Sequence, residues 1–125
     1  MELTLIGNAM LTNKDYCDYE TCVALRELGY DDSTDLRYNS YGSLGDFLGG
    51  IKAPTLYEAQ KWLREEKGVI VEVFVDDDSD TPITYNIHKD GECVCHHHGK
   101  YWTVKEWSEA LSEGIKEAVK ILKEE

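Results

Sequence analysis

The dipeptide Asp90-Gly91 lies between two runs of strand-forming residues, ITYNIHK and ECVCHHH. An Asp-Gly pair accepts the positive backbone angles of a type I′ turn, which joins two antiparallel strands directly. Residues 83–98 are therefore predicted to form a β-hairpin. A third run rich in β-branched residues, VIVEVFV (69–75), precedes the hairpin. We expect the three strands to form one antiparallel meander.

Two amphipathic helices are predicted, one on each side of these strands. Thr55 and Glu58 make a capping box, in which each side chain binds the backbone N–H of the other at the start of a helix. Thr103 and Glu106 make a second capping box before a longer helix. The residues expected to face the core are Leu56, Ala59, Trp62 and Leu63 in the first helix and Val104, Trp107, Leu111, Ile115, Ala118 and Leu122 in the second.

The first 53 residues give weaker signals. A short strand is expected at 3–6, and Asp18 is expected to cap a helix. No periodicity persists over residues 30–53, so this segment, which contains glycine and tyrosine, is predicted to be a long loop. We therefore predict that all 125 residues form a single α+β domain. Its two-layer α-β-β-β-α core (54–125), with both helices on one face of the sheet, follows the short strand, the helix and the loop.

The chain is acidic, with 25 Asp and Glu residues against 13 Lys and Arg residues and a formal net charge of -12. Proteins bind nucleic-acid backbones through Lys and Arg, so direct nucleic-acid binding is not expected. The charge favours solubility or a partner protein with a basic surface. Within the long loop, Tyr38, Tyr41 and Phe47 are the candidate partner-binding residues, because exposed aromatic side chains are typical of protein interfaces.

The amino terminus lacks the cationic start and apolar segment of a signal peptide, and no apolar run is long enough to span a membrane. The expected location is the cytoplasm, where the four cysteines would stay thiols. A thiol or hydrolytic enzyme would need Cys17 or Cys22 beside a base such as His88 or His97. The alternative is that both cysteines are small packing residues of the helix and its surroundings.

The Cys/His hairpin is the candidate metal site, with His88, Cys93, Cys95 and His97 as zinc ligands. His88 lies opposite Cys93 in the predicted register, with Cβ atoms about 5 Å apart, so these two side chains could converge on one ion. Strand alternation puts Cys93 and Cys95 on one face, but about 6.6 Å apart. Zinc ligands lie within about 4 Å of one another. A polar sheet face is therefore the first interpretation, and a zinc site is the alternative.

Asp76, Asp78 and Asp80 have the spacing of the first three ligands of an EF-hand calcium loop. The glycine that this loop needs at its sixth position is replaced by Thr81, and its last glutamate is replaced by Ile87. The match to a calcium site is therefore partial, and a solvated acidic turn is the alternative.

Three segments resemble a family of small, uncharacterised proteins encoded by phages and prophages of gut bacteria. They are the helix APTLYEAQKWLREEKG, the closing YWTVKEWSEALSEGIKEAVKIL and, more loosely, CDYETCVALRELGY. The resemblance implies an accessory protein of the host cytoplasm and carries over no catalytic residue. The order helix, three strands, helix also resembles the double-stranded RNA-binding domain. That family binds phosphates through a lysine cluster at the start of its last helix, where this chain has VKEWSE and only Lys105.

The leading functional hypothesis is a non-enzymatic, acidic protein-binding accessory protein of phage or prophage origin. It would bind a host or phage protein and need no cofactor. A metal-binding protein that uses the Cys/His hairpin is the first alternative, and a small thiol or hydrolytic enzyme is the second. An acidic mimic of nucleic acid is a sharper form of the leading hypothesis, because it requires Asp and Glu to line one face.

Overall fold

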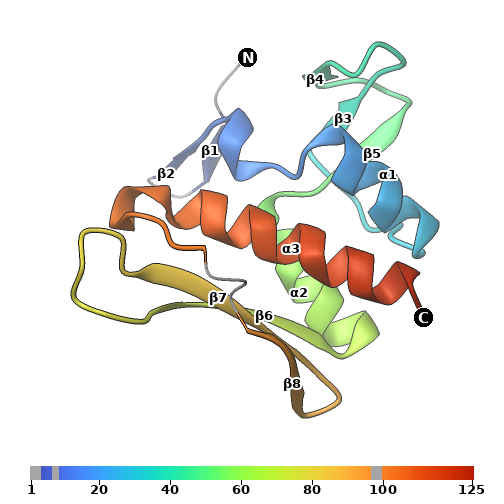
Figure 1. Ribbon diagram of the computed structural model, residues 1–125. Helices are drawn as coiled ribbons and strands as arrows, with labels where there is room; N and C mark the ends of the chain where they lie inside the picture. The colour runs from blue at the N-terminus through green and yellow to red at the C-terminus, as the bar shows by residue number, and fades with distance from the viewer. Residues whose placement is uncertain (1–3, 7–8, 97–99) are drawn as a thin grey trace.

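The structure, a computed structural model, describes residues 4–6, 9–96 and 100–125 (Figure 1). Within these ranges the chain forms three α-helices and eight strands, which pair into three antiparallel sheets. The C-terminal part contains α2 (Leu56–Lys67), β6 (Val69–Val75), β7 (Ile83–Lys89), β8 (Glu92–His96) and α3 (Trp107–Lys123). The N-terminal part contains β1 (Thr4–Ile6), β2 (Ala9–Leu11), α1 (Tyr19–Glu27), β3 (Leu36–Tyr38), β4 (Leu44–Gly45) and β5 (Ile51–Ala53).

The C-terminal part has the predicted α-β-β-β-α order. β7 is the central strand of the sheet β6-β7-β8, and α2 and α3 lie on the same side of this sheet (Figure 1). Asp90 and Gly91 form the turn between β7 and β8 with φ angles of 53° and 85°, as a type I′ turn requires. The predicted α+β fold class is therefore confirmed.

The pairing of β7 with β8 contains a bulge that the sequence analysis did not predict. His88 pairs with Cys93 as expected, but Ile87 pairs with Cys95, so Val94 is an extra residue in β8. A β-bulge of this kind breaks the alternation of faces along a strand. Cys95 is consequently buried in the core while Cys93 and Val94 are exposed. The prediction that Cys93 and Cys95 share one face of the sheet is wrong.

Both predicted capping boxes are present. At the start of α2, the N–H of Glu58 donates to Oγ1 of Thr55 at 3.1 Å, and the N–H of Thr55 donates to Oε1 of Glu58 at 2.8 Å. The second box, at Thr103, begins a short 3-10 helix (Val104–Glu106) instead of α3 itself. This turn has a different residue spacing from an α-helix. Val104, which was predicted to face the core, is therefore 66% exposed.

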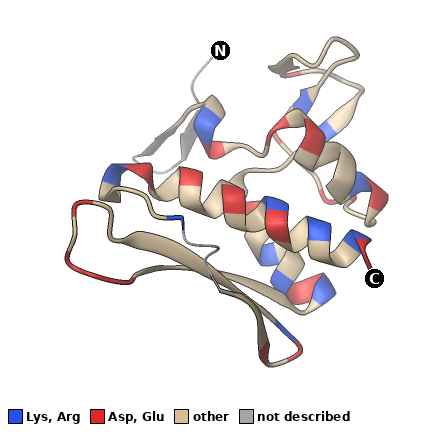
Figure 2. Ribbon diagram, viewed as in Figure 1, with Lys and Arg blue, Asp and Glu red and all other residues tan. Residues whose placement is uncertain are grey.

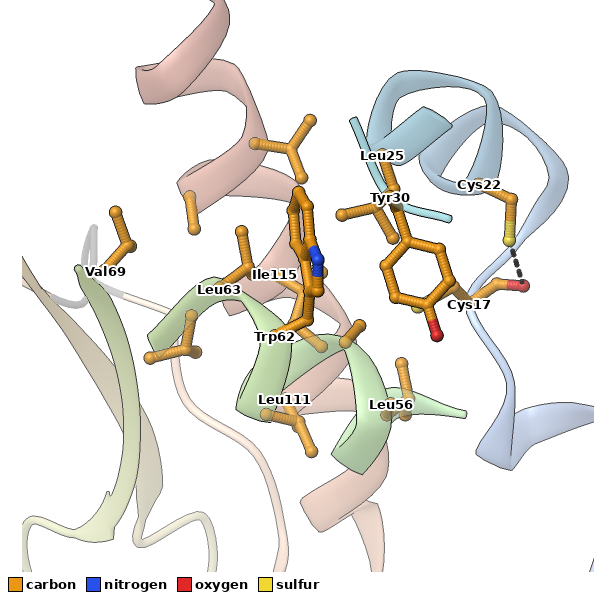
Figure 3. Packing of buried hydrophobic residues seen from close by; sticks show 14 of the residues in the cluster. Cys17, Cys22, Leu25, Tyr30, Leu56, Trp62, Leu63, Val69, Leu111 and Ile115 are labelled. Atoms are coloured by element: carbon orange, nitrogen blue, oxygen red, sulfur yellow. Dashed lines mark hydrogen bonds between the residues drawn. The ribbon is translucent and has the colours of Figure 1, made fainter. Parts of the chain in front are cut away.

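Helix α1 packs into the same core as α2 and α3. Leu25 of α1, Leu63 of α2 and Ile115 of α3 are each fully buried in one cluster (Figure 3). Tyr30, just after α1, meets Trp62 of α2 edge to face, with ring centroids 5.3 Å apart. One hydrophobic core therefore joins the N-terminal and C-terminal parts of the chain.

Gly114 lets α3 approach the sheet closely. A Cβ atom at this position would lie 2.5 Å from Cγ1 of Val71 and 3.4 Å from the ring of Tyr85. Such a distance is far shorter than a normal carbon–carbon contact of about 3.5–4.0 Å. The backbone of α3 therefore rests directly on side chains of β6 and β7.

Residues 30–53, predicted to be a loop, contain the three short strands of the sheet β4-β3-β5. Each of these strands has only two or three residues, too few to show a period of two. Nearer the amino terminus, the predicted strand is present as β1, which pairs with β2 in a hairpin. Asp18 caps α1, and its Oδ1 atom accepts a hydrogen bond from the N–H of Thr21 at 2.8 Å.

Candidate functional site

The structure separates the candidate zinc ligands of the hairpin. His88 lies on the face of the sheet that points away from the helices, and its Nε2 atom is 3.0 Å from Oε1 of Glu72. Cys93 donates a weak hydrogen bond from Sγ to the carbonyl oxygen of Cys95 at 3.5 Å. Cys95 faces the core, and burial raises the pKa of its thiol. His97 lies outside the described residues.

A complete metal site is not formed by the part of the chain that the structure describes. His, Cys, Asp and Glu side chains there make no group of three or more that could hold a metal ion. Structural zinc sites use four nitrogen or sulfur ligands, and His88 with Cys93 supplies only two. Cys95 cannot join them because the bulge turns it toward the core. A zinc site that includes His97 stays a prediction.

The three candidate calcium ligands lie on the exposed turn between β6 and β7. This turn is closed by its own backbone, because the N–H of Asp76 donates to the carbonyl oxygen of Pro82 at 2.8 Å. Within it, Oδ1 of Asp77 accepts the N–H of Ser79 at 2.9 Å. An aspartate that bonds its own backbone two residues on is a common turn former. Among the described residues, Asp76, Asp78 and Asp80 belong to no group of His, Cys, Asp and Glu side chains that could hold a metal ion, which favours the solvated acidic turn.

The two N-terminal cysteines are packing residues. Cys17 and Cys22 are each 1% exposed, and Sγ of Cys22 donates to the carbonyl oxygen of Cys17 at 3.5 Å (Figure 3). The adjacent Cys22 thiol and burial raise the pKa of Cys17 well above its ordinary value. A thiol acts as a nucleophile through its thiolate, so this environment opposes catalysis. Cys17 and Cys22 lie in the core, whereas His88 lies on the outer face of the sheet β6-β7-β8. The sheet therefore separates His88 from both cysteines, and His88 cannot act as their base.

One of the three predicted partner-binding residues is part of the core. Tyr38 is buried, and its hydroxyl donates to the carbonyl oxygen of Cys17 at 2.8 Å. Its ring meets Tyr19 of α1 edge to face, with centroids 5.6 Å apart. Tyr38 therefore fastens β3 to the segment before α1 and offers no surface to a partner. A tyrosine in an irregular sequence gives no sign of which role it has.

The other two candidates lie on a projection that we call the arm, residues 39–50. The arm extends from the top of β3 and β5, away from the three helices (Figure 1). Tyr41 is 90% exposed and Leu48 is 102% exposed, while Phe47 is 38% exposed. Leu48 was not singled out in the sequence, because a leucine beside a phenylalanine is equally typical of a buried strand. Three large apolar side chains thus meet solvent on one short segment.

Hydrogen bonds fix the backbone that carries Tyr41. The Oδ1 atom of Asn39 accepts the N–H groups of Tyr41 at 2.9 Å and Ser43 at 3.0 Å. The N–H of Asn39 donates to the carbonyl oxygen of Ser43, also at 3.0 Å. Further along the arm, the ring of Phe47 lies against Gly45, where a Cβ atom would be only 2.9 Å from the ring. The backbone from Asn39 to Ser43, which carries Tyr41, is therefore held by its own hydrogen bonds.

Charged side chains are mixed over the rest of the surface. Lys and Arg lie among Asp and Glu on all three helices, and the longest purely acidic stretch is the β6–β7 turn (Figure 2). Several of the basic groups are paired with acids, as in Lys116 with Asp18 at 3.0 Å and Lys123 with Glu27 at 2.7 Å. A mimic of nucleic acid requires acidic groups along one face, and this distribution does not support it.

No helix in the described part of the chain is both long enough and apolar enough to cross a membrane. No protein-family model matches the chain, and neither a curated protein nor a solved structure shows significant similarity to it.

Proposed function

We propose that this protein is a non-enzymatic binding protein that docks onto another protein through its arm. One observation carries the proposal: Tyr41 and Leu48 are almost fully exposed on the arm, and hydrogen bonds to Asn39 hold the backbone around Tyr41. Large apolar side chains that gather in solvent are typical of interaction sites. Tyrosine is also among the residues that contribute most to binding at protein interfaces.

An ordered arm favours binding because little conformational entropy is lost when the partner arrives. Fixing a side chain or loop at an interface costs free energy, and a backbone that is already ordered avoids much of that cost. Asn39 bonds the backbone on both sides of Tyr41 in the free protein. The phenol ring can therefore enter a pocket of the partner without rearrangement of the turn.

The chemistry of the partner follows from the arm and the net charge. An apolar pocket would receive Tyr41 and Leu48, and a basic rim would face Asp46, which is exposed beside Phe47. A net charge of -12 would steer a basic partner toward the protein from a distance. In this proposal the protein acts in the cytoplasm as an accessory protein of a phage or prophage, and its partner is a host or phage protein.

The test compares three forms of the protein as bait in a host lysate: wild type, the double variant Tyr41→Ala/Leu48→Ala, and Val104→Ala. Val104 is exposed but lies on the short 3-10 helix before α3, outside the arm, so it is the matched control. A protein that is retained by wild type and Val104→Ala but lost from the double variant is then purified and titrated. We expect at least about tenfold weaker binding to the double variant, with unfolding unchanged, because anchor residues often contribute 2 kcal/mol or more.

Two results would contradict the proposal. The first is a set of captured proteins that is the same for the wild type and the double variant. The second is a purified partner that binds both forms with equal affinity. Raised salt should also slow association, since steering by net charge is screened by ions.

A further inference from the structure

A second feature lies at the base of the arm, on the side of α1. Arg26, Arg37 and Lys52 line one pocket of about 180 Å³ together with Cys22, Tyr30, Asp31 and Gly50. The three basic residues come from α1, β3 and β5, which are separate elements (Figure 2). Three cations and one carboxylate leave the lining with two net positive charges, in a protein whose net charge is -12.

The strand register explains why two of the basic residues line the same pocket. Arg37 of β3 lies directly opposite Lys52 of β5 in the antiparallel pair. Residues directly opposite each other project to the same face of a sheet, and like charges in this position destabilise the pairing. Lys52 is partly relieved, because its Nζ atom donates to the carbonyl oxygen of Asp31 at 2.8 Å and to its Oδ1 atom at 3.0 Å. Arg37 forms no ion pair of this kind with any carboxylate in the described ranges.

Neither arginine of the pocket is neutralised by a carboxylate among the residues that the structure describes. Acidic residues outnumber basic ones by 25 to 13 in this chain, so partners for Arg26 and Arg37 would be easy to supply. Arg37 is also half-buried, and a charged group removed from water without a counter-ion is costly. The lining of the pocket therefore includes two arginines that form no ion pair with a described carboxylate.

We propose that this pocket binds a terminal phosphate group, either as inorganic phosphate or as a small phosphomonoester. Guanidinium groups form paired, charge-assisted hydrogen bonds with phosphate oxygens, and Lys52 adds a point charge. A phosphate dianion matches the two net positive charges of the lining. The volume is below the about 300–1,000 Å³ of pockets for drug-sized ligands, so a phosphate with a small attached group fits and a nucleotide does not. This proposal is independent of the arm binding a protein.

The test is a titration of the isotope-labelled protein with inorganic phosphate, followed by backbone amide NMR at constant ionic strength set with chloride. Saturable shifts are expected at the amides of Arg37, Gly50 and Lys52. Arg26→Gln and Arg37→Gln should each weaken binding by about tenfold, the effect of losing one charge-assisted interaction. Arg64→Gln is the matched control, because Arg64 lies on the exposed surface of α2 outside the pocket, and it should bind as the wild type does.

Acetate and O-phosphoserine distinguish the ligand classes. Acetate, with one negative charge, should bind at least about tenfold more weakly than phosphate. Binding of O-phosphoserine would indicate a phosphomonoester ligand, whereas its exclusion would indicate inorganic phosphate; both outcomes support a phosphate pocket. The proposal is overturned if the shifts do not saturate, if acetate binds as tightly as phosphate, or if Arg26→Gln binds like the wild type. Arg26 is exposed on α1, so its variant tests the pocket even if Arg37→Gln fails to fold.

Discussion

The sheet β6-β7-β8 and the sheet β4-β3-β5 are both three-stranded and antiparallel, yet they have different surroundings. The first has strands of five to seven residues, and its inner face is covered by α2 and α3 (Figure 1). The second has strands of two or three residues, and only Tyr38 and Ala53 of its side chains are buried. The first sheet therefore supplies the core, while the second holds the arm out in solvent.

The residues that stabilise the fold and the proposed binding surface lie in different regions of this molecule. Removal of apolar surface from water stabilises a fold by about 25 cal/mol per Å², so the long sheet and its helices carry most of the stability. The arm buries little and leaves Tyr41 and Leu48 outside. Substitutions on the arm are therefore expected to leave the protein folded.

The largest contrast is expected between two leucines of the two regions. Leu63→Ala would open a cavity in the core, where Leu63 is fully buried, and should lower the free energy of unfolding by about 2–5 kcal/mol. Leu48→Ala on the arm should change it by less than about 0.5 kcal/mol, as exposed substitutions usually do. Urea unfolding of both variants measures the contrast, and equal losses would show that the arm is part of the core.

Alanine substitutions at two glycines, one in α3 and one on the arm, should also differ in their effect on stability, by less than the two leucine substitutions do. Gly114→Ala would place a methyl group against Val71 of β6, and overpacking of this kind costs about 1–3 kcal/mol. Alanine is the better helix former by about 1 kcal/mol, so part of the cost is offset. Gly49→Ala on the arm meets nothing within 4 Å and should be neutral. A Gly114→Ala protein as stable as the wild type would mean that α3 moves away from the sheet without cost.

The junction between the two regions is held by the cap of α2. Thr55→Ala removes the side chain that accepts the N–H of Glu58 and should lower the free energy of unfolding by about 1 kcal/mol. Thr81→Ala is the control, since Thr81 lies on the exposed β6–β7 turn and uses only its backbone N–H in a hydrogen bond. Thermal unfolding should separate the two variants. If both shift the midpoint equally, the cap has no stabilising role.

The smallest effect concerns pH and the attachment of α1 to α3. Partial burial raises the pKa of Asp18, but hydrogen bonds from Thr21 and Lys116 outweigh burial and hold it below its ordinary value. A depressed folded pKa means that the ionised Asp18 stabilises the protein at neutral pH, and that this contribution is lost as the pH falls through the folded pKa. Asp18→Asn keeps a capping oxygen and removes the charge.

Urea unfolding of the wild type and Asp18→Asn therefore measures the charge contribution directly. The stability difference should be largest near neutral pH and shrink as the pH is lowered from about 6 to about 3, through the ordinary range of an aspartate. Asp46→Asn, an exposed substitution on the arm, provides the comparison for a general effect of charge. If the difference in unfolding free energy between the wild type and Asp18→Asn stays constant over this pH range, the ionised Asp18 carboxylate does not stabilise the fold.

The elements predicted correctly from the sequence depend on short-range chemistry. The Asp90-Gly91 turn, the capping box at Thr55 and the cap at Asp18 each involve residues no more than three positions apart. Their hydrogen bonds are formed by the local chain, so residue type and spacing predict them. The four apolar positions of α2 were predicted for the same reason, because one face of a helix is fixed by its period.

The predictions that were wrong concern residues whose positions depend on contacts between distant parts of the chain. The bulge in β8 sends Cys95 into the core although the pattern of the strand predicts that it shares a face with Cys93. Tyr38 is buried because Cys17, 21 residues earlier in the chain, accepts its hydroxyl. Arg37 and Lys52 share a pocket with Arg26 only because β3 pairs with β5 beside α1. None of these contacts can be predicted from the residues on either side in the sequence.

Residue types and their spacing predicted the fold class, the order of helices and strands in residues 54–125, and the acidic balance of the chain. These features were predictable because helix caps, tight turns and apolar periodicity are local properties of a chain. Packing of distant segments placed Cys95 in the core, Tyr41 in solvent, and Arg26 and Arg37 in one pocket. Those outcomes depend on contacts between distant segments, and such contacts exist only after the chain has packed.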